Sequence, residues 1–251
     1  MKNRKIIVFV FCTFFCLGQL VSQEIYVKVT YKKKSTIVLK NNNKKNEING
    51  ILRKSQENMS KLEYNLIFDN RSSLFKEVSK MNIDDNKNAL ATKLSRMFGD
   101  TQGVFFTDRE TGKTIHQKEF ESEFFLIEHE KINDWVLTQE KKKIGNYICY
   151  KAIKNDAYIN SSGEKKYFNV IAWYTQELPY PYGPTTYNSL PGVILELINR
   201  QVNIYASKIE LNPKQRRSIT VPKEGVNVTN VKYDSIISGL ATDFRKKYKR
   251  N

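Results

Sequence analysis

Residues 173–196 read WYTQELPYPYGPTTYNSLPGVILE, and this stretch does most to define the expected fold. A strand ends at Tyr174, and the next strand opens at Leu190-Pro191-Gly192. The loop between them carries three prolines, one glycine and three tyrosines. Proline presets φ and glycine permits positive φ, so covalent chemistry fixes the backbone of this loop. Such a loop serves either as a recognition surface or as a packed plug that closes one end of a β structure. In the first case, at least one tyrosine ring should reach the surface.

Most of the chain around this loop has the pattern of strands. Apolar residues alternate with polar ones from Ile25 to Tyr31 and from Leu62 to Phe68, which is the period of a half-buried strand. Strands are predicted over residues 24–31, 36–39, 62–68, 104–107, 114–120, 123–128, 134–139, 145–153, 166–175, 193–199 and 201–211. This regular series favours a mainly β fold, in which one antiparallel sheet curls into a bowl or half-barrel.

Four segments between the strands read as turns or loops. Residues 40–60 are polar and predict a loop, and residues 79–102 lack a clean period, with one or two helical turns at most. Residues 155–164 include SSG and predict a turn between two long strands. Thr111-Gly112 predicts the turn of a hairpin.

One helix is predicted, over about residues 231–249. Its apolar side chains fall on one stripe at helical spacing, and basic residues crowd its last turn, where they complement the helix macrodipole. The stripe consists of Tyr233, Ile236, Ile237, Leu240, Phe244 and Tyr248. We expect this C-terminal helix to pack on the sheet.

Residues 1–22 have the pattern of a signal peptide. Basic residues 2, 4 and 5 precede the apolar run IIVFVFCTFFCL, and the chain turns polar at Ser22. We expect cleavage after Ser22, with Gly18 as the alternative site, and a single domain over residues 23–251. The other interpretation of this segment is an uncleaved anchor helix. No second stretch reaches membrane-spanning length, so no transmembrane span is expected after signal removal.

Signal removal leaves Cys149 as the one cysteine of the chain. A single cysteine forms no internal disulfide and supplies no cysteine-based zinc site. Cys149 lies in the strand-like NYICYKAI, where a half-buried, unreactive thiol is the usual outcome. The core must therefore stabilise this exported domain without covalent cross-links.

The chain is strongly basic, with 42 Lys and Arg against 26 Asp and Glu and a net charge of +16. Basic clusters lie at residues 32–34, 44–45, 141–143 and 245–250. They indicate either solvated surface in a lysine-rich chain or an anionic partner. No motif interleaves aromatic and arginine residues, so nucleic acid is not an expected partner.

The sequence singles out no catalytic, cofactor-binding or metal-binding residue. His129 stands between two glutamates, but neighbours in a strand point to opposite faces and do not converge on one ion. Ser189 lacks the two glycines of a nucleophile elbow, because Tyr187 and Pro191 occupy their places. No cofactor is expected.

SLPGVILE resembles the motif of the GLPGLI family of exported bacterial envelope proteins. Ser189 stands where that family has Gly, and Val193 where it has Leu. Three further segments resemble the family: EYNLIFDNRSSLFK, then Asp134-Trp135 with KKKIGNYICYKA, and AWYTQELPYPYGP. The positions singled out, with a structural or an interaction role, are Trp135, Gly145, Cys149, Lys151, Trp173, Tyr174, Pro179, Tyr180, Tyr182, Gly183, Pro184, Tyr187, Leu190, Pro191 and Gly192.

The family is similar to the N-terminal bowl-like domain of one class of peptide:N-glycanase. This resemblance implies a curved antiparallel β structure accompanied by helix. It does not imply glycanase activity, because the catalytic part of such enzymes is a separate domain. The substitution Ser189 also predicts that the first glycine of the motif is dispensable for the backbone here.

Three classes of function stay open at this point. The leading hypothesis is an exported, non-enzymatic module of the periplasm or outer membrane, or of the extracellular space, that binds an envelope protein or a ligand, with an anionic one as a candidate. The second is a hydrolase acting on glycan or peptide with carboxylates on the concave face, and the third is a structural accessory of an outer-membrane complex. Ionisable residues that converge in the bowl would favour the enzyme.

Overall fold

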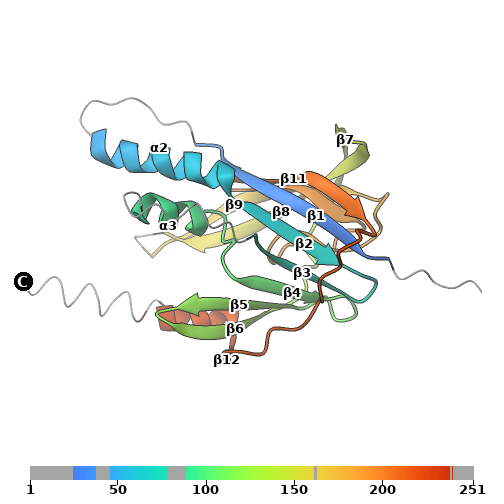
Figure 1. Cartoon of the computed structure of the whole chain (residues 1–251). Coiled ribbons are helices and arrows are strands. Elements are labelled where there is room, and N and C mark those ends of the chain that lie inside the picture. The colour runs from blue at the N-terminus through green and yellow to red at the C-terminus, as the bar shows by residue number, and fades with distance from the viewer. Residues whose placement is uncertain (1–24, 38–45, 79–88, 161–162, 238, 240–251) are drawn as a thin grey trace, which may run out of the picture.

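The computed structural model describes residues 25–37, 46–78, 89–160, 163–237 and 239, and these contain a single twelve-stranded sheet (Figure 1). The strands are β1 (Val27–Ser35), β2 (Glu63–Phe68), β3 (Ser72–Glu77), β4 (Val104–Asp108), β5 (Thr114–Phe120), β6 (Glu123–His129), β7 (Val136–Ile144), β8 (Tyr147–Ile159), β9 (Lys165–Thr175), β10 (Val193–Asn199), β11 (Val202–Leu211) and β12 (Val226–Thr229). Their order is β12-β6-β5-β4-β3-β2-β1-β11-β10-β9-β8-β7, so β1 is central, and β12 and β7 are the two edges of an open, curled sheet.

The expectation of a mainly β fold with a curled antiparallel sheet is confirmed. Every neighbouring pair of strands is antiparallel except β12 and β6, which run parallel. The exception arises because β12 follows a long connection, residues 212–225, that leaves β11 and crosses the sheet to its far edge (Figure 1). The sequence analysis missed β12, whose four residues are too few to show a period.

The core covers one face of the sheet, which we call the inner face. It is defined by Val27, Val29 and Tyr31 of β1 and by the residues opposite them in register on the neighbouring strands. Those on β2 are Phe68, Leu66 and Tyr64, and the row continues through Phe75 of β3 to Phe105 of β4. All of these side chains are at most 1% exposed, because alternate residues of each strand share one face.

Two helices lie in segments that were predicted mainly as loops. Residues 40–60 were predicted as a loop, but the structure has α2 (Asn46–Lys61) there. Within 79–102, α3 (Ala89–Met97) lies where one or two helical turns were expected, at residues 89–98. The two helices lie side by side at one end of the sheet (Figure 1). Part of the side that α2 buries is polar: Asn58 donates to the Thr92 hydroxyl of α3 across 3.1 Å, so the apolar stripe is short.

A buried lysine attaches the end of α3 to the central strand. Lys33 of β1 is fully buried, and its Nζ donates to the carbonyl of Phe98 at 2.9 Å and to the Thr101 hydroxyl at 2.7 Å. A cation at this end of a helix complements the partial negative charge of the last carbonyls. Burial lowers the Lys33 pKa to about 7, although nearby Glu77 and Asp100 oppose this shift.

The C-terminal helix is present, as expected, in the part that the structure describes. Residues 230–237 and 239 are helical, and the remainder of the predicted segment lies outside the described residues. Tyr233 packs edge-on against Phe125 of β6 with ring centroids 5.4 Å apart, and Ile236 and Ile237 join the same cluster. The helix therefore packs against the β12–β6 edge. The proposed signal peptide, residues 1–22, also lies outside the described residues.

Several strand boundaries differ from the prediction. Residues 36–39 were expected as a short partner of the first strand, but β1 pairs with β2 and β11, and residues 36 and 37 are not in a strand. Residues 155–164 were expected as a turn, but β8 continues to Ile159 because its alternate residues pair with β9 down to Lys165. The predicted hairpin around Thr111-Gly112 is confirmed as β4–β5, with Gly112 at φ +70°.

The loop between β9 and β10 enters β10 through two close backbone contacts. A Cβ on Gly192 would lie 1.9 Å from the carbonyl oxygen of Thr175, and one on Gly183 would lie 2.4 Å from that of Tyr187. The reason for glycine at 192 is therefore the close approach of the Thr175 carbonyl. Ser189, in contrast, has φ +71°, so the position where the GLPGLI motif has glycine does require a left-handed backbone. Serine adopts that conformation here, which agrees with the expectation that glycine is dispensable at this position, although a left-handed backbone is less favourable for serine than for glycine.

We expect Gly192→Ala to lower the free energy of unfolding by roughly 3 kcal/mol or more, because neither backbone atom at the contact can move without displacing β9 or β10. Denaturant unfolding measures the change. Gly50→Ala is the matched control: a Cβ there meets nothing within 4 Å, and alanine in helix α2 should raise stability by up to about 1 kcal/mol. Equal midpoints for wild type and Gly192→Ala would contradict the contact.

Candidate functional site

The tyrosine-rich loop fills the inner face of the sheet. The rings of Tyr180 and Tyr182 pack on Phe68 of β2 with centroids 5.2 and 5.3 Å apart, respectively. Tyr187 lies at the other end of the loop and packs beside Trp135 at 6.2 Å. The three tyrosines are 8%, 0% and 8% exposed, so the expectation that at least one ring reaches the surface is wrong.

Hydrogen bonds hold the second half of this loop to three other segments. The Tyr187 hydroxyl donates to Asp156 of β8 at 3.2 Å and accepts from the Asn199 amide, also at 3.2 Å. The Trp135 indole donates to the carbonyl of Asn188 at 2.9 Å. The loop between β9 and β10 is therefore a packed plug within the bowl. Of the two roles considered for this loop, recognition surface or packed plug, its contacts agree with the second.

The remaining positions singled out from sequence divide between this plug and the β7–β9 sheet. Leu190 is fully buried and Pro191 is exposed at the entry to β10. Lys151 pairs with Glu140 at 2.8 Å, and the Lys142 ammonium lies 4.2 Å from the centre of the Trp173 ring. The other members are Gly145, a turn residue at φ +58° between β7 and β8, Tyr174, buried on β9, and Pro179, Gly183 and Pro184, within the plug.

Cys149 is fully buried and free, more buried than the half-buried thiol expected from its strand pattern. Burial is the main reason why the pKa of its thiol rises to about 11. A thiol of that pKa stays protonated at neutral pH, so Cys149 acts as a core residue.

The loop also meets a carboxylate, Asp156, which is already engaged. It accepts the Tyr187 hydrogen bond through one oxygen, and the other lies 3.5 Å from the Lys154 ammonium. Burial, together with the neighbouring Asp156 carboxylate, holds the Tyr187 pKa far above its usual range. Over the described ranges, no three His, Cys, Asp or Glu side chains gather closely enough to hold a metal ion.

Two histidines that the sequence analysis treated separately lie together. A two-residue turn at Glu121-Ser122, with φ +50° and +68°, joins β5 to β6 and places His116 opposite Ile127. His129 is two residues further on the same face, and the two imidazole rings are 5.9 Å apart. The register of this hairpin was the signal that could have brought the pair together.

Burial controls the charge of this pair. His116 is 2% exposed, stacks on Phe105 at 3.8 Å and contacts the Gln102 carbonyl through Nε2 at 2.8 Å. Desolvation lowers its pKa to about 4, although Asp100 opposes the shift; it lowers the pKa of His129 as well. Lys118, which pairs with Asp100 at 2.9 Å, adds to the lowering of both. Both rings are therefore neutral at pH 7, as part of the packed interior.

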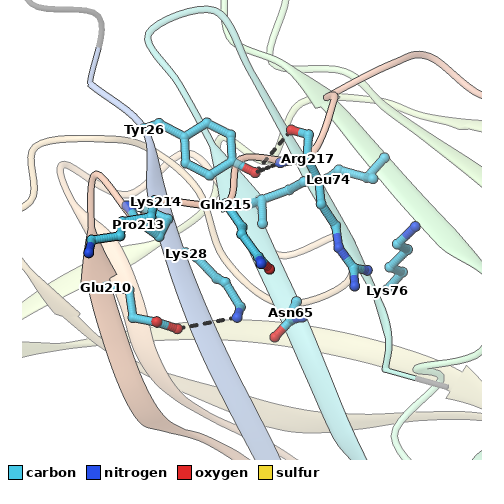
Figure 2. Close-up of a pocket in the computed structure, with 11 residues that line it drawn as sticks. Tyr26, Lys28, Asn65, Leu74, Lys76, Glu210, Pro213, Lys214, Gln215 and Arg217 are labelled. Atoms are coloured by element: carbon cyan, nitrogen blue, oxygen red, sulfur yellow. Dashed lines mark hydrogen bonds and ion pairs between the residues drawn. The ribbon is translucent and has the colours of Figure 1, made fainter. Parts of the chain in front are cut away.

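A groove of about 410 Å³ lies on the opposite, outer face of the sheet, where it crosses β11, β1, β2 and β3 (Figure 2). In-register pairs set its floor: Lys28 stands opposite Glu210, and Asn65 stands opposite Lys76. Its remaining wall is the connection that follows β11. We define the groove by its polar residues, which are Lys28, Asn65, Lys76, Glu210, Lys214, Gln215 and Arg217.

Tyr26 holds that wall in place. Its hydroxyl donates to the Arg217 carbonyl at 3.0 Å and accepts from the Arg217 N–H at 2.9 Å (Figure 2). Its backbone N–H donates to the Asn212 side-chain oxygen at 3.0 Å, and its carbonyl accepts from the Asn212 N–H at 2.7 Å. These four hydrogen bonds, which we call the Tyr26 clamp, fix the wall against β1.

The groove has an excess of positive charge. Its lining holds four basic side chains and one carboxylate, that of Glu210. Glu210 is already paired with Lys208 at 3.0 Å and Lys28 at 3.2 Å, and these contacts lower its pKa, Lys208 first. Among the residues that the structure describes, no carboxylate lies within 4 Å of the charged groups of Lys76, Lys214 or Arg217. The arrangement suits an anion. The sequence gives no local signal for this groove, because its basic residues are far apart in the chain.

Comparison with known proteins gives a partial family match and a match of fold. A family model described as "Protein of unknown function (Porph_ging)" matches residues 154–196, from β8 through the plug into β10. Two solved structures of PNGF-II, in space groups P21 and C2, match with TM-scores of 0.51 and 0.52 at 17% identity. They cover 85% of this chain, which spans about one third of theirs (33% and 32%).

These matches support a bowl-like fold shared with PNGF-II, and a segment typical of a family of unknown function. Assignment to the GLPGLI family stays a prediction. A comparison with curated proteins gives no match. Within the described ranges, no helix has the length and apolar character needed to cross a membrane.

Two tyrosine variants test the plug. Tyr182 is fully buried and its hydroxyl has no hydrogen-bond partner, so Tyr182→Phe should leave the free energy of unfolding within about 0.5 kcal/mol of wild type or raise it. Tyr187→Phe should lower it by about 1–2 kcal/mol, because Asp156 and Asn199 lose a buried partner. Equal effects in denaturant unfolding would refute the assigned hydrogen bonds.

The buried His116 predicts a dependence of stability on pH. Its folded pKa, about 4, lies below the value of about 6.5 expected in the unfolded chain, so the unfolded state binds the proton more readily. Stability from this group is complete above pH 6.5 and falls by about 1–3 kcal/mol as the pH drops towards 4. His116→Phe keeps an aromatic ring on Phe105 and should flatten the pH profile in this window. A profile parallel to wild type would count against the assignment.

Proposed function

We propose that this protein is a non-enzymatic binding module of the bacterial cell envelope that holds an anionic ligand in the groove on the outer face of its sheet. The observation that carries the proposal is the lining of four basic side chains against one carboxylate that is already paired. A concave site with unpaired cations attracts carboxylate, phosphate or sulfate groups. Export, inferred from residues 1–22, puts the ligand outside the cytoplasm.

The packing of the inner face supports this choice of surface. Tyr182 and Leu190 are fully buried there, so the plug occupies the space where the bowl would hold a ligand. The alternative function, a hydrolase with carboxylates on the concave face, needs open carboxylates in that space. Asp156, the carboxylate that meets the plug, is bonded to Tyr187 and lies beside Lys154. This favours binding over catalysis.

The proposal is tested with small anions. Citrate, phosphate and sulfate, titrated at low ionic strength, should shift the amide NMR signals of groove residues on β1, β2 and β3. Lys76→Glu should weaken citrate binding by at least about 10-fold, because it removes one cation of the floor and adds a like charge to the ligand.

Lys143→Glu is the matched control. Lys143 is exposed on β7, at the far edge of the sheet, and the substitution changes the net charge equally. It should leave citrate binding within about twofold of wild type. The two substitutions change the net charge by the same amount, but Lys143 is far from the groove, where salt screens its charge. The proposal fails if no anion shifts groove signals, or if both variants weaken binding to the same extent.

A further inference from the structure

A second cavity adjoins the groove, on the other side of the Tyr26 clamp. It measures about 350 Å³ and shares Tyr26 and Arg217 with the groove. Arg71 and Arg216 also line it, so we call it the arginine cavity. The two hollows are therefore two compartments of one basic surface.

The single carboxylate in the arginine cavity is occupied by the backbone. One oxygen of Asp69 accepts from the N–H groups of Arg71 at 2.7 Å and Ser72 at 2.8 Å, which closes the turn between β2 and β3. The Arg216 guanidinium lies 5.6 Å from the centre of the Tyr26 ring and donates to the Asn212 side-chain oxygen at 3.4 Å, and the residue is exposed. Arg71 and Arg216 line this compartment beside a carboxylate that is committed to the fold, whereas the Arg217 side chain extends into the groove (Figure 2), and the compartment suits a second anion.

The groove also has uncharged groups between its cations. The amides of Asn65 and Gln215 line it beside Lys28 and Lys76. The Asn65 oxygen already accepts from the Thr30 hydroxyl at 3.2 Å, so Asn65 offers its N–H donors, and Gln215 offers both a donor and an acceptor to a hydroxyl group. A ligand that alternates anionic groups with hydroxyls uses every polar type on this surface, whereas a simple inorganic anion uses the cations alone.

We infer that the ligand is an anionic oligosaccharide that places one charged sugar in the groove and another in the arginine cavity, spanning the Tyr26 clamp. This inference rests on the proposed function and adds the ligand class and the second compartment. Once one anionic unit is bound, the linked second unit binds in an intramolecular step. The affinity of a longer chain should therefore rise by more than the statistical factor for its number of binding units.

The test compares galacturonic acid with hexagalacturonate by isothermal titration at fixed ionic strength. Wild type should bind the oligosaccharide more tightly by at least about 10-fold after correction for the number of units. Arg216→Gln removes a cation from the arginine cavity alone and should abolish this chain-length gain, while binding of the monosaccharide stays within about twofold. Arg216→Lys should restore much of the gain. Thermal melting of each variant verifies that the Tyr26 clamp is intact.

Lys76→Gln provides the reciprocal variant, because Lys76 lines the groove alone. It should weaken the monosaccharide and the oligosaccharide alike, whereas Lys143→Gln on β7 should change neither. Vesicles of phosphatidylglycerol form a further arm and distinguish a lipid headgroup from a glycan as the source of the anion.

The outcomes separate the two proposals. If citrate and galacturonic acid bind in the groove but hexagalacturonate gains nothing, or keeps its gain in Arg216→Gln, the two-compartment ligand is wrong and the proposed function stands. If vesicles bind through Lys76 and Arg216 while hexagalacturonate does not, the glycan is wrong. If no anion binds in the groove, both proposals fall.

Discussion

The contact between Gly192 and the carbonyl of Thr175 is the constraint on which the arrangement of the bowl depends. It brings the two ends of a long, proline-rich loop together where β9 stops and β10 begins. Backbone hydrogen bonds from Val193 to Leu178 and from Ile194 to Tyr182, both 3.0 Å, then fold the loop back over the sheet. Tyr31 of the central strand completes the closure by donating to the Ile194 carbonyl at 2.6 Å. The loop thus fills the interior, and backbone hydrogen bonds between the loop and the start of β10 hold it there.

The plug fills the concave face of the sheet and so leaves the convex face, which is the outer face, for partners. A curled sheet with an empty concave face would offer that face as its binding site, but here aromatic side chains of the plug stack on Phe68 and exclude solvent. The convex side receives a second covering, residues 212–225, which is held at the Tyr26 clamp and reaches Gln117 of β5 through the Glu224 carbonyl at 2.8 Å. Because this covering is narrow, it forms walls and leaves hollows beside them.

Sequence patterns predicted the strands well, and predicted contacts between distant segments poorly. Val27, Val29 and Tyr31 show their burial by alternation alone, because neighbours in a strand face opposite ways. Helix α2 escaped prediction because Ser55 and Asn58 occupy its buried side, where a periodic pattern needs apolar residues. The groove could not be predicted for another reason: strand order brings Lys28 and Lys76 to one face, and the path of the connection after β11 brings Arg217 to them. The basic cluster at 141–143, which is evident in the sequence, lies instead on an exposed edge strand.

The path of residues 212–225 has a consequence for how the binding surface comes into being. The sheet from β1 to β11 can be built from pairs of antiparallel neighbours, but β12 must travel across the outer face to meet β6 in parallel. Such a long-range, parallel pairing closes a large loop and is entropically slow to form. The wall of the groove is part of the same segment, so the cavity exists only once residues 212–225 have docked on the outer face. Affinity for an anion would then report whether this segment of the chain has docked on the sheet.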